Sequence, residues 1–137
     1  MSFREKSAWI TLVTVLVCFG VYFGSIVTGV VGRGFGEVHL LLACVLALAA
    51  LQLGLSFIAA RTTPRDGRAP RDEREILIQA RSHSFGYYLL IGLVLAVAAS
   101  GHVDHNMIDL MNFGMLAVVL AVAAVAIAQI VMFRRGL

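Results

Sequence analysis

Four long stretches without any charged side chain are the feature that most constrains how this 137-residue chain can fold. They cover residues 7–32, 38–60, 82–103 and 110–133, and they hold 26, 23, 22 and 24 residues. A helix needs about 20 largely apolar residues to cross a hydrocarbon core roughly 30 Å thick. Each stretch is therefore long enough to span a membrane once as a helix.

The composition of the whole chain agrees with membrane spans. Apolar residues make up 60% of the sequence and charged residues only 14%, whereas an ordinary soluble domain has about 25% charged residues. Membrane strands would alternate in polarity over about 10 residues, and these stretches do not alternate. We therefore predict an all-α fold, a four-helix transmembrane bundle in a single integral membrane domain, 1–137, with spans at about residues 8–31, 38–60, 82–101 and 111–133.

The positive charges predict the orientation of this bundle. Ten of the eleven Lys and Arg residues fall before the first span, between the second and third, or after the fourth, and only Arg33 falls elsewhere. Loops rich in Lys and Arg stay in the cytoplasm. We expect a multi-pass protein of the cell inner membrane with both termini cytoplasmic (N-in/C-in). The basic excess then reflects topology and attraction to the lipid bilayer, and we expect no nucleic-acid partner.

The segment between the second and third spans has two parts. Residues 61–71 contain both prolines and a glycine, which predicts an irregular cytoplasmic linker. Asp72 is a suitable helix N-cap, with Glu75 three residues later as in a capping box. No helix-breaking residue follows before about Ser100, so this helix would exceed the membrane core by roughly two turns. Residues 72–81 are therefore predicted to form a helical overhang in the cytoplasm.

This overhang is the candidate partner-binding surface. Its Ile76, Leu77 and Ala80 form a short apolar stripe that must face a partner, the headgroups or the inner loop. The alternative is a solvated overhang that only orients the third span. The charged candidate residues are Asp72, Glu73, Arg74, Glu75 and Arg81.

The opposite face of the membrane carries a second candidate site. The topology brings Glu37, His102, Asp104 and His105 to the outer side, and His, Asp and Glu are suitable ligands for zinc or another divalent metal. Haem or quinone binding through the outer histidines is a further alternative. The competing interpretation is an ordinary wet loop in which Asp104 or Asn106 caps the fourth span.

The interior of the spans offers little chemistry. No charged residue lies deep in a span, although ion pumps and proton relays usually need one there. Deep polar groups such as Thr14 are expected to bond with neighbours or backbone carbonyls, and small-residue pairs such as Gly92 with Ala96 favour close helix packing. The two cysteines, Cys18 and Cys44, are expected to behave as small hydrophobes unless the first two helices bring them together.

The stretch "RDEREILIQARSHSFGYYLL" (71–90) resembles a motif of uncharacterised small four-span bacterial inner-membrane proteins. In that group, D-E-R-x and a short amphipathic helix precede a third span that begins near an aromatic pair. The N-terminal "REKSAWITLVTVLV" (4–17) is similar in style. The resemblance implies the fold and the location, and it implies no activity or catalytic residue.

These observations favour a protein that acts through contacts. The chain has no G-x-S-x-G, H-E-x-x-H or Walker motif, and we expect no enzymatic activity and no cofactor. We expect an accessory or regulatory subunit that uses helix packing and its charged cytoplasmic loop to bind another membrane protein, a cytoplasmic protein or a second copy of itself. The alternative is a membrane protein that binds a metal, haem or quinone through its outer cluster.

Reporter fusions test the predicted orientation. A cytoplasmic reporter fused at Gly67 should be active and one fused at Asp104 inactive, because the arginine-rich linker stays inside. A periplasmic signal from the Gly67 fusion would contradict the N-in/C-in topology.

Overall fold

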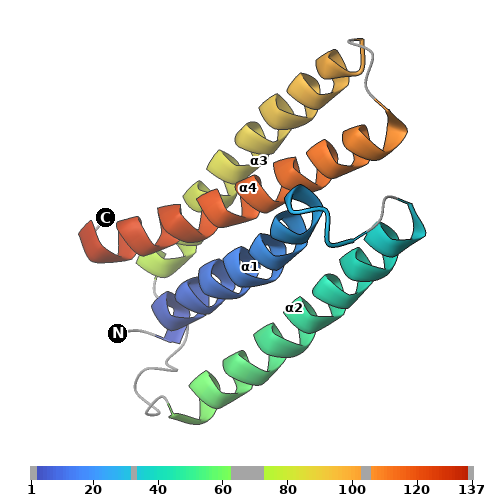
Figure 1. Ribbon diagram of the computed structural model, residues 1–137. Coiled ribbons are helices and arrows are strands. Elements are labelled where there is room, and N and C mark those ends of the chain that lie inside the picture. The colour runs from blue at the N-terminus through green and yellow to red at the C-terminus, as the bar shows by residue number, and fades with distance from the viewer. Residues whose placement is uncertain (1–2, 32–33, 63–72, 103–105, 136–137) are drawn as a thin grey trace. The chain divides into compact units, whose positions relative to one another are not determined.

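Four α-helices account for nearly all of the residues that the computed structural model describes, which are 3–31, 34–62, 73–102 and 106–135. The helices are α1 (Phe3–Val27), α2 (Phe35–Thr62), α3 (Glu73–Ser100) and α4 (Met107–Arg135), and no strand occurs in these ranges (Figure 1). Each helix is long and apolar enough to cross a membrane. The predicted all-α, four-helix fold is thus confirmed, and its helices have the length and hydropathy of a multi-pass membrane protein.

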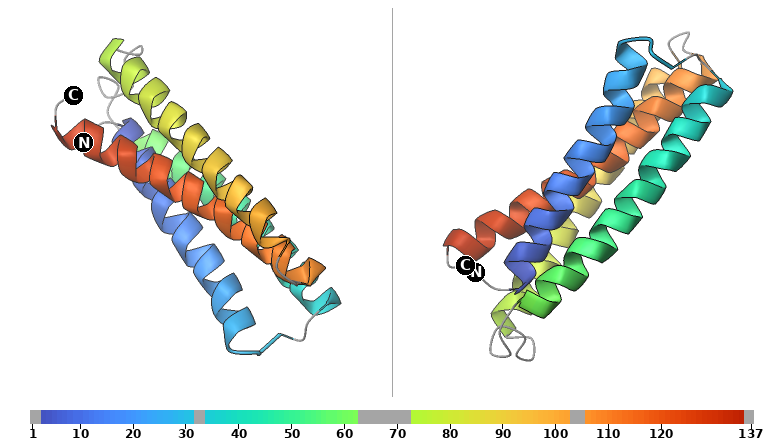
Figure 2. Two further views of the ribbon diagram at one scale, coloured as in Figure 1. Left: turned by 90° about the horizontal axis from the view of Figure 1, so that it is seen from above. Right: turned by 60° about the horizontal axis from the view of Figure 1, so that its bottom comes forward.

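The chain divides into two compact units, Met1–Pro70 and Arg71–Leu137. In the first, α1 packs against α2, and in the second, α3 packs against α4. The two helices of each pair run antiparallel (Figures 1 and 2). Short connections between consecutive helices produce this hairpin arrangement.

The helix α1 ends at Val27, before the predicted boundary of the first span at residue 31. Gly29 adopts a positive φ of 67°, and its N–H donates to the Ile26 carbonyl oxygen at 3.1 Å. A glycine in the left-handed region commonly terminates a helix, because it has no Cβ to clash there. The glycine-rich stretch after α1 therefore forms a turn rather than further helix.

The helix α3 begins at Glu73 and ends at Ser100, as the sequence predicted. Its 28 residues are continuous, which gives a length of about 42 Å at 1.5 Å per residue. The charged beginning of α3 and its apolar remainder therefore belong to one rigid rod. Asp72, the predicted N-cap, lies outside the described residues.

The helices α3 and α4 approach each other closely at Gly86. A Cβ at this position would overlap Cγ2 of Val125 and lie 3.8 Å from the Ala121 carbonyl oxygen. Ile78 and Ser82 are buried on the same face of α3, about two turns and one turn before Gly86 respectively. Small residues at four-residue spacing allow helix backbones to approach closely in membranes. Ser82 and Gly86 provide this spacing here.

Gly92, one member of the small-residue pair that the sequence suggested in α3, does not make such a contact. A Cβ built at Gly92 meets no atom within 4 Å. The close approach at Gly86 therefore lies six residues nearer to the start of α3 than Gly92.

A matched pair of substitutions tests this packing. Gly86→Ala should destabilise the protein by about 1–3 kcal/mol, because the added methyl overpacks a helix interface and Val125, being β-branched, has little rotamer freedom to move away. Gly92→Ala should be neutral or slightly stabilising, since it fills open space. Thermal unfolding in detergent measures both.

The double variant Gly86→Ala/Val125→Ala should recover most of the lost stability, because it removes the methyl that overlaps. Equal stability of the Gly86→Ala and Gly92→Ala proteins would contradict the contact.

Candidate functional site

Polar side chains gather on the covered stripes of α1 and α2. Along α1, positions spaced alternately three and four residues apart are buried or half-buried, which is the periodicity of a helix that packs along one line. We call the two stripes together the α1–α2 seam. Its members are Ala8, Thr11, Val15, Cys18, Tyr22 and Ser25 on α1, and Glu37, Leu41, Cys44, Leu48, Gln52, Ser56 and Ala59 on α2.

The part of the α1–α2 seam nearest the turn between the two helices brings ionisable groups together. Tyr22 is 2% exposed and Glu37 is 6% exposed. The Tyr22 hydroxyl lies close enough to the Glu37 carboxyl and the Cys44 thiol to interact with them electrostatically. The Cys44 and Cys18 thiols interact in the same way. Glu37 is in the first turn of α2, where the helix dipole stabilises negative charge. The seam therefore combines a carboxyl, a phenol and two thiols.

The sequence prediction did not include Tyr22 or the two cysteines as site residues. Their spacing carried the missing signal, because Cys18, Tyr22 and Ser25 follow each other at four and three residues along α1. One polar stripe on an otherwise apolar helix indicates the face that turns away from lipid.

Several other polar side chains bond to carbonyl oxygens of their own helices, as the sequence predicted for Thr14. The Thr14 hydroxyl donates to the Ile10 carbonyl oxygen at 2.7 Å, and the Ser82 hydroxyl donates to that of Gln79 at 3.0 Å. Such bonds satisfy a hydroxyl where water is absent. These residues therefore need no ligand.

Two of the predicted metal-binding residues, Glu37 and His102, lie within the described residues and belong to different compact units. Glu37 is buried in the first unit, whereas His102 is exposed in the turn after α3 in the second. Asp104 and His105 lie outside the described residues. In the described ranges, no three His, Cys, Asp or Glu side chains come close enough to hold a metal ion. Metal binding at the outer cluster stays a prediction.

The predicted partner-binding residues are largely accessible. Glu73, Arg74 and Arg81 are exposed and Glu75 is half-buried, while Asp72 lies outside the described residues. We use the term α3 overhang for the described part of this segment, Glu73–Arg81. The predicted apolar stripe, Ile76, Leu77 and Ala80, is also exposed. The buried residue on this part of α3 is Ile78 instead.

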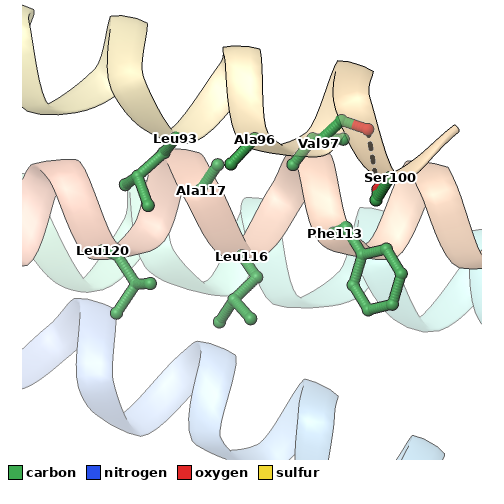
Figure 3. A pocket seen from close by; sticks show the side chains of 8 residues that line it. All are labelled: Leu93, Ala96, Val97, Ser100, Phe113, Leu116, Ala117 and Leu120. Carbon is green, nitrogen blue, oxygen red and sulfur yellow. Dashed lines mark hydrogen bonds between the residues drawn. The ribbon is translucent and has the colours of Figure 1, made fainter.

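A groove of about 320 Å³ lies between α3 and α4 (Figure 3). The only hydroxyl in its lining, that of Ser100, donates to the Val97 carbonyl oxygen at 2.7 Å. Specific ligand sites usually add a few polar groups that orient the ligand. This lining is instead compatible with hydrocarbon. The lining residues are Leu93, Ala96, Val97, Ser100, Phe113, Leu116, Ala117 and Leu120.

Comparison with protein-family models, with curated proteins and with solved structures gave no match. Inferences about function therefore rest on the chemistry and geometry of the chain itself.

Elemental analysis of the purified protein tests the outer metal cluster. If the cluster binds a divalent metal, the protein should retain the ion after desalting, and His102→Ala with His105→Ala should remove it, because each change deletes a nitrogen ligand. His83→Ala is the matched control, since the Nδ1 of His83 bonds to the Gln79 carbonyl oxygen at 2.8 Å, away from this cluster. Metal-free wild-type protein, without haem absorbance, would contradict the metal and haem hypotheses.

Proposed function

We propose that this chain is a four-span protein of the cell inner membrane that works without catalysis, as an accessory or regulatory subunit. Both termini lie in the cytoplasm, and the α3 overhang contacts another membrane or cytoplasmic protein. The observation that carries the proposal is the uninterrupted extension of a membrane-length helix into a segment with exposed charged and apolar side chains.

Exposed hydrophobic side chains support the membrane location. Leu46, Leu53 and Leu95 are 62%, 74% and 64% exposed, and they lie well inside candidate spans. A soluble protein rarely exposes large contiguous apolar patches. Lipid chains provide an apolar environment for these side chains at no such cost.

The positions of aromatic and basic residues support the proposed place along α3 at which the helix enters the bilayer. Tyr87 and Tyr88 are both exposed, with their rings edge-to-face at 5.6 Å between centroids. Tyrosines collect at the headgroup level of membranes, and Arg81 lies two turns before them. The α3 overhang then lies on the aqueous side of this boundary.

The end of α2 supports the same cytoplasmic boundary. The guanidinium carbon of Arg61 lies 4.2 Å from the centre of the Phe57 ring. This cation–π contact holds a positive charge at the end of an apolar helix, as expected of an arginine that extends toward headgroups.

The composition of the α3 overhang favours a protein partner over a lipid surface. Ile76 and Leu77 are 48% and 47% exposed, with the exposed Glu73 and Arg74 nearby. An apolar centre with a charged rim is typical of a protein interface. Anionic headgroups attract basic residues, and the acidic Glu73 and Glu75 would oppose that attraction. A partner with basic residues fits these carboxylates best.

Charge reversal tests the α3 overhang as an interface. Glu73→Lys with Glu75→Lys should leave insertion intact, since added positive charge agrees with a cytoplasmic location. Co-purification of the partner in mild detergent should fall by about tenfold or more, because unfavourable charge pairs at an interface cost several kcal/mol. The partner is identified by mass spectrometry after cross-linking in membranes.

Two control variants separate charge from position. Glu73→Gln with Glu75→Gln should cause an intermediate loss, because it removes the attraction without adding repulsion. Arg135→Glu, at the end of α4, should leave co-purification unchanged. Unchanged capture with the double Lys variant, or no captured protein with the wild type, would contradict the proposal. Capture of a second copy of this chain would identify a homo-oligomer.

A further inference from the structure

The two cysteines lie at equal distances from the turn that joins α1 and α2. Cys18 precedes the last residue of α1, Val27, by nine residues, and Cys44 follows the first residue of α2, Phe35, by nine residues. At 1.5 Å per residue, each lies about 14 Å from the hairpin end of its helix. The helices α1 and α2 run antiparallel (Figure 1). Equal distances from their hairpin ends therefore place the two cysteines at about the same height.

Both thiols also lie on the covered sides of their helices. Cys18 is 6% exposed and Cys44 is 7% exposed, whereas the adjacent Val17 and Val45 are 55% and 40% exposed. Both cysteines are free, and both belong to the α1–α2 seam. Height and helix face therefore agree in bringing the two thiols together across the hairpin.

We propose that Cys18 and Cys44 form a reversible dithiol–disulfide pair that links α1 to α2 within the membrane span. This pair is independent of the α3 overhang and of the partner proposed for it. A disulfide carries no charge, so an apolar span accommodates it without the cost of burying an ion. The link would fix the register of the two helices along the α1–α2 seam.

The environment of the thiols determines which oxidant can act on them. Thiolates are disfavoured in apolar surroundings, and a charged or bulky disulfide reagent cannot enter a span readily. A small uncharged peroxide can. Closely spaced thiols favour this chemistry, because a second thiol can trap the first oxidised product before it reacts further.

The reaction balances in two steps. The sulfur of one cysteine attacks an oxygen of hydrogen peroxide, which gives a sulfenic acid and one water. The sulfur of the other cysteine then attacks the sulfenic sulfur, and the leaving hydroxyl combines with the thiol proton as a second water. Two electrons pass from the thiols to the peroxide. A small dithiol reverses the link by exchange, becoming a cyclic disulfide itself and restoring both thiols.

The experiment uses the full-length protein in lipid nanodiscs treated with hydrogen peroxide. Remaining thiols are then tagged with a maleimide after denaturation, and peptides are mapped by mass spectrometry. Both thiols should disappear together, one Cys18–Cys44 peptide should appear within single chains, and dithiothreitol should restore both thiols. Cys18→Ala should abolish the linked peptide.

A displaced thiol provides the matched control. The variant Cys44→Ala/Ala47→Cys keeps a thiol on α2 one turn away, at a position where Ala47 is exposed. Its thiol should be trapped as a sulfenic acid by a 1,3-dione reagent and should not pair with Cys18, which shows that peroxide enters the span.

Three results would overturn the proposal. The first is survival of both native thiols at a peroxide dose that oxidises the displaced thiol. The second is pairing of the displaced thiol with Cys18 as readily as in the native protein. The third is native disulfides that form only between chains, which would place the thiols on an outer face.

Discussion

Hydrogen bonding of the main chain is the constraint on which the rest of this structure depends. In a membrane core no water is available to backbone N–H and C=O groups, so a spanning segment must satisfy them internally as a helix. The side chains obey the same constraint. The hydroxyls of Thr14, Ser82 and Ser100 each donate to a carbonyl oxygen of their own helix. Hydrogen bonds within each helix thus determine helix formation. Tertiary packing determines only which face of each helix is covered.

The two helix pairs make that choice differently. The α1–α2 seam holds the buried ionisable side chains among the described residues of its unit, which are Cys18, Tyr22, Glu37 and Cys44. The α3–α4 pair instead relies on close approach at Gly86 and leaves an apolar groove further along. Among the described residues, the buried ionisable side chains therefore belong to the first unit. Contact with a partner is proposed for the second, where α3 continues beyond its apolar segment.

The sequence predicted the helices well and the covered faces poorly, for one main physical reason. Uncharged length alone identifies a span. The predicted bounds of α3 followed from the N-cap residue Asp72 and from the continuous helical pattern up to about Ser100. In lipid, however, exposed and covered faces are both apolar, so periodicity gives little indication of helix rotation. The small-residue pattern consequently indicated Gly92 and not Gly86. Tyr22 was missed for a different reason, because the polar spacing of Cys18, Tyr22 and Ser25 was present in the sequence and was not used. The end of α1 depended on the backbone conformation of Gly29, which composition does not reveal. The outer metal cluster includes Asp104 and His105, outside the described residues, so it stays a prediction.

The central claim is that four helices span the membrane and that α3 extends beyond it. Amide hydrogen exchange of the protein in lipid nanodiscs tests it most directly. The account predicts strong protection through the apolar parts of all four helices, and markedly faster exchange for Glu73–Arg81 than for the rest of α3. Rapid exchange throughout any one helix, or equal protection of α3 from its first turn to its last, would contradict it.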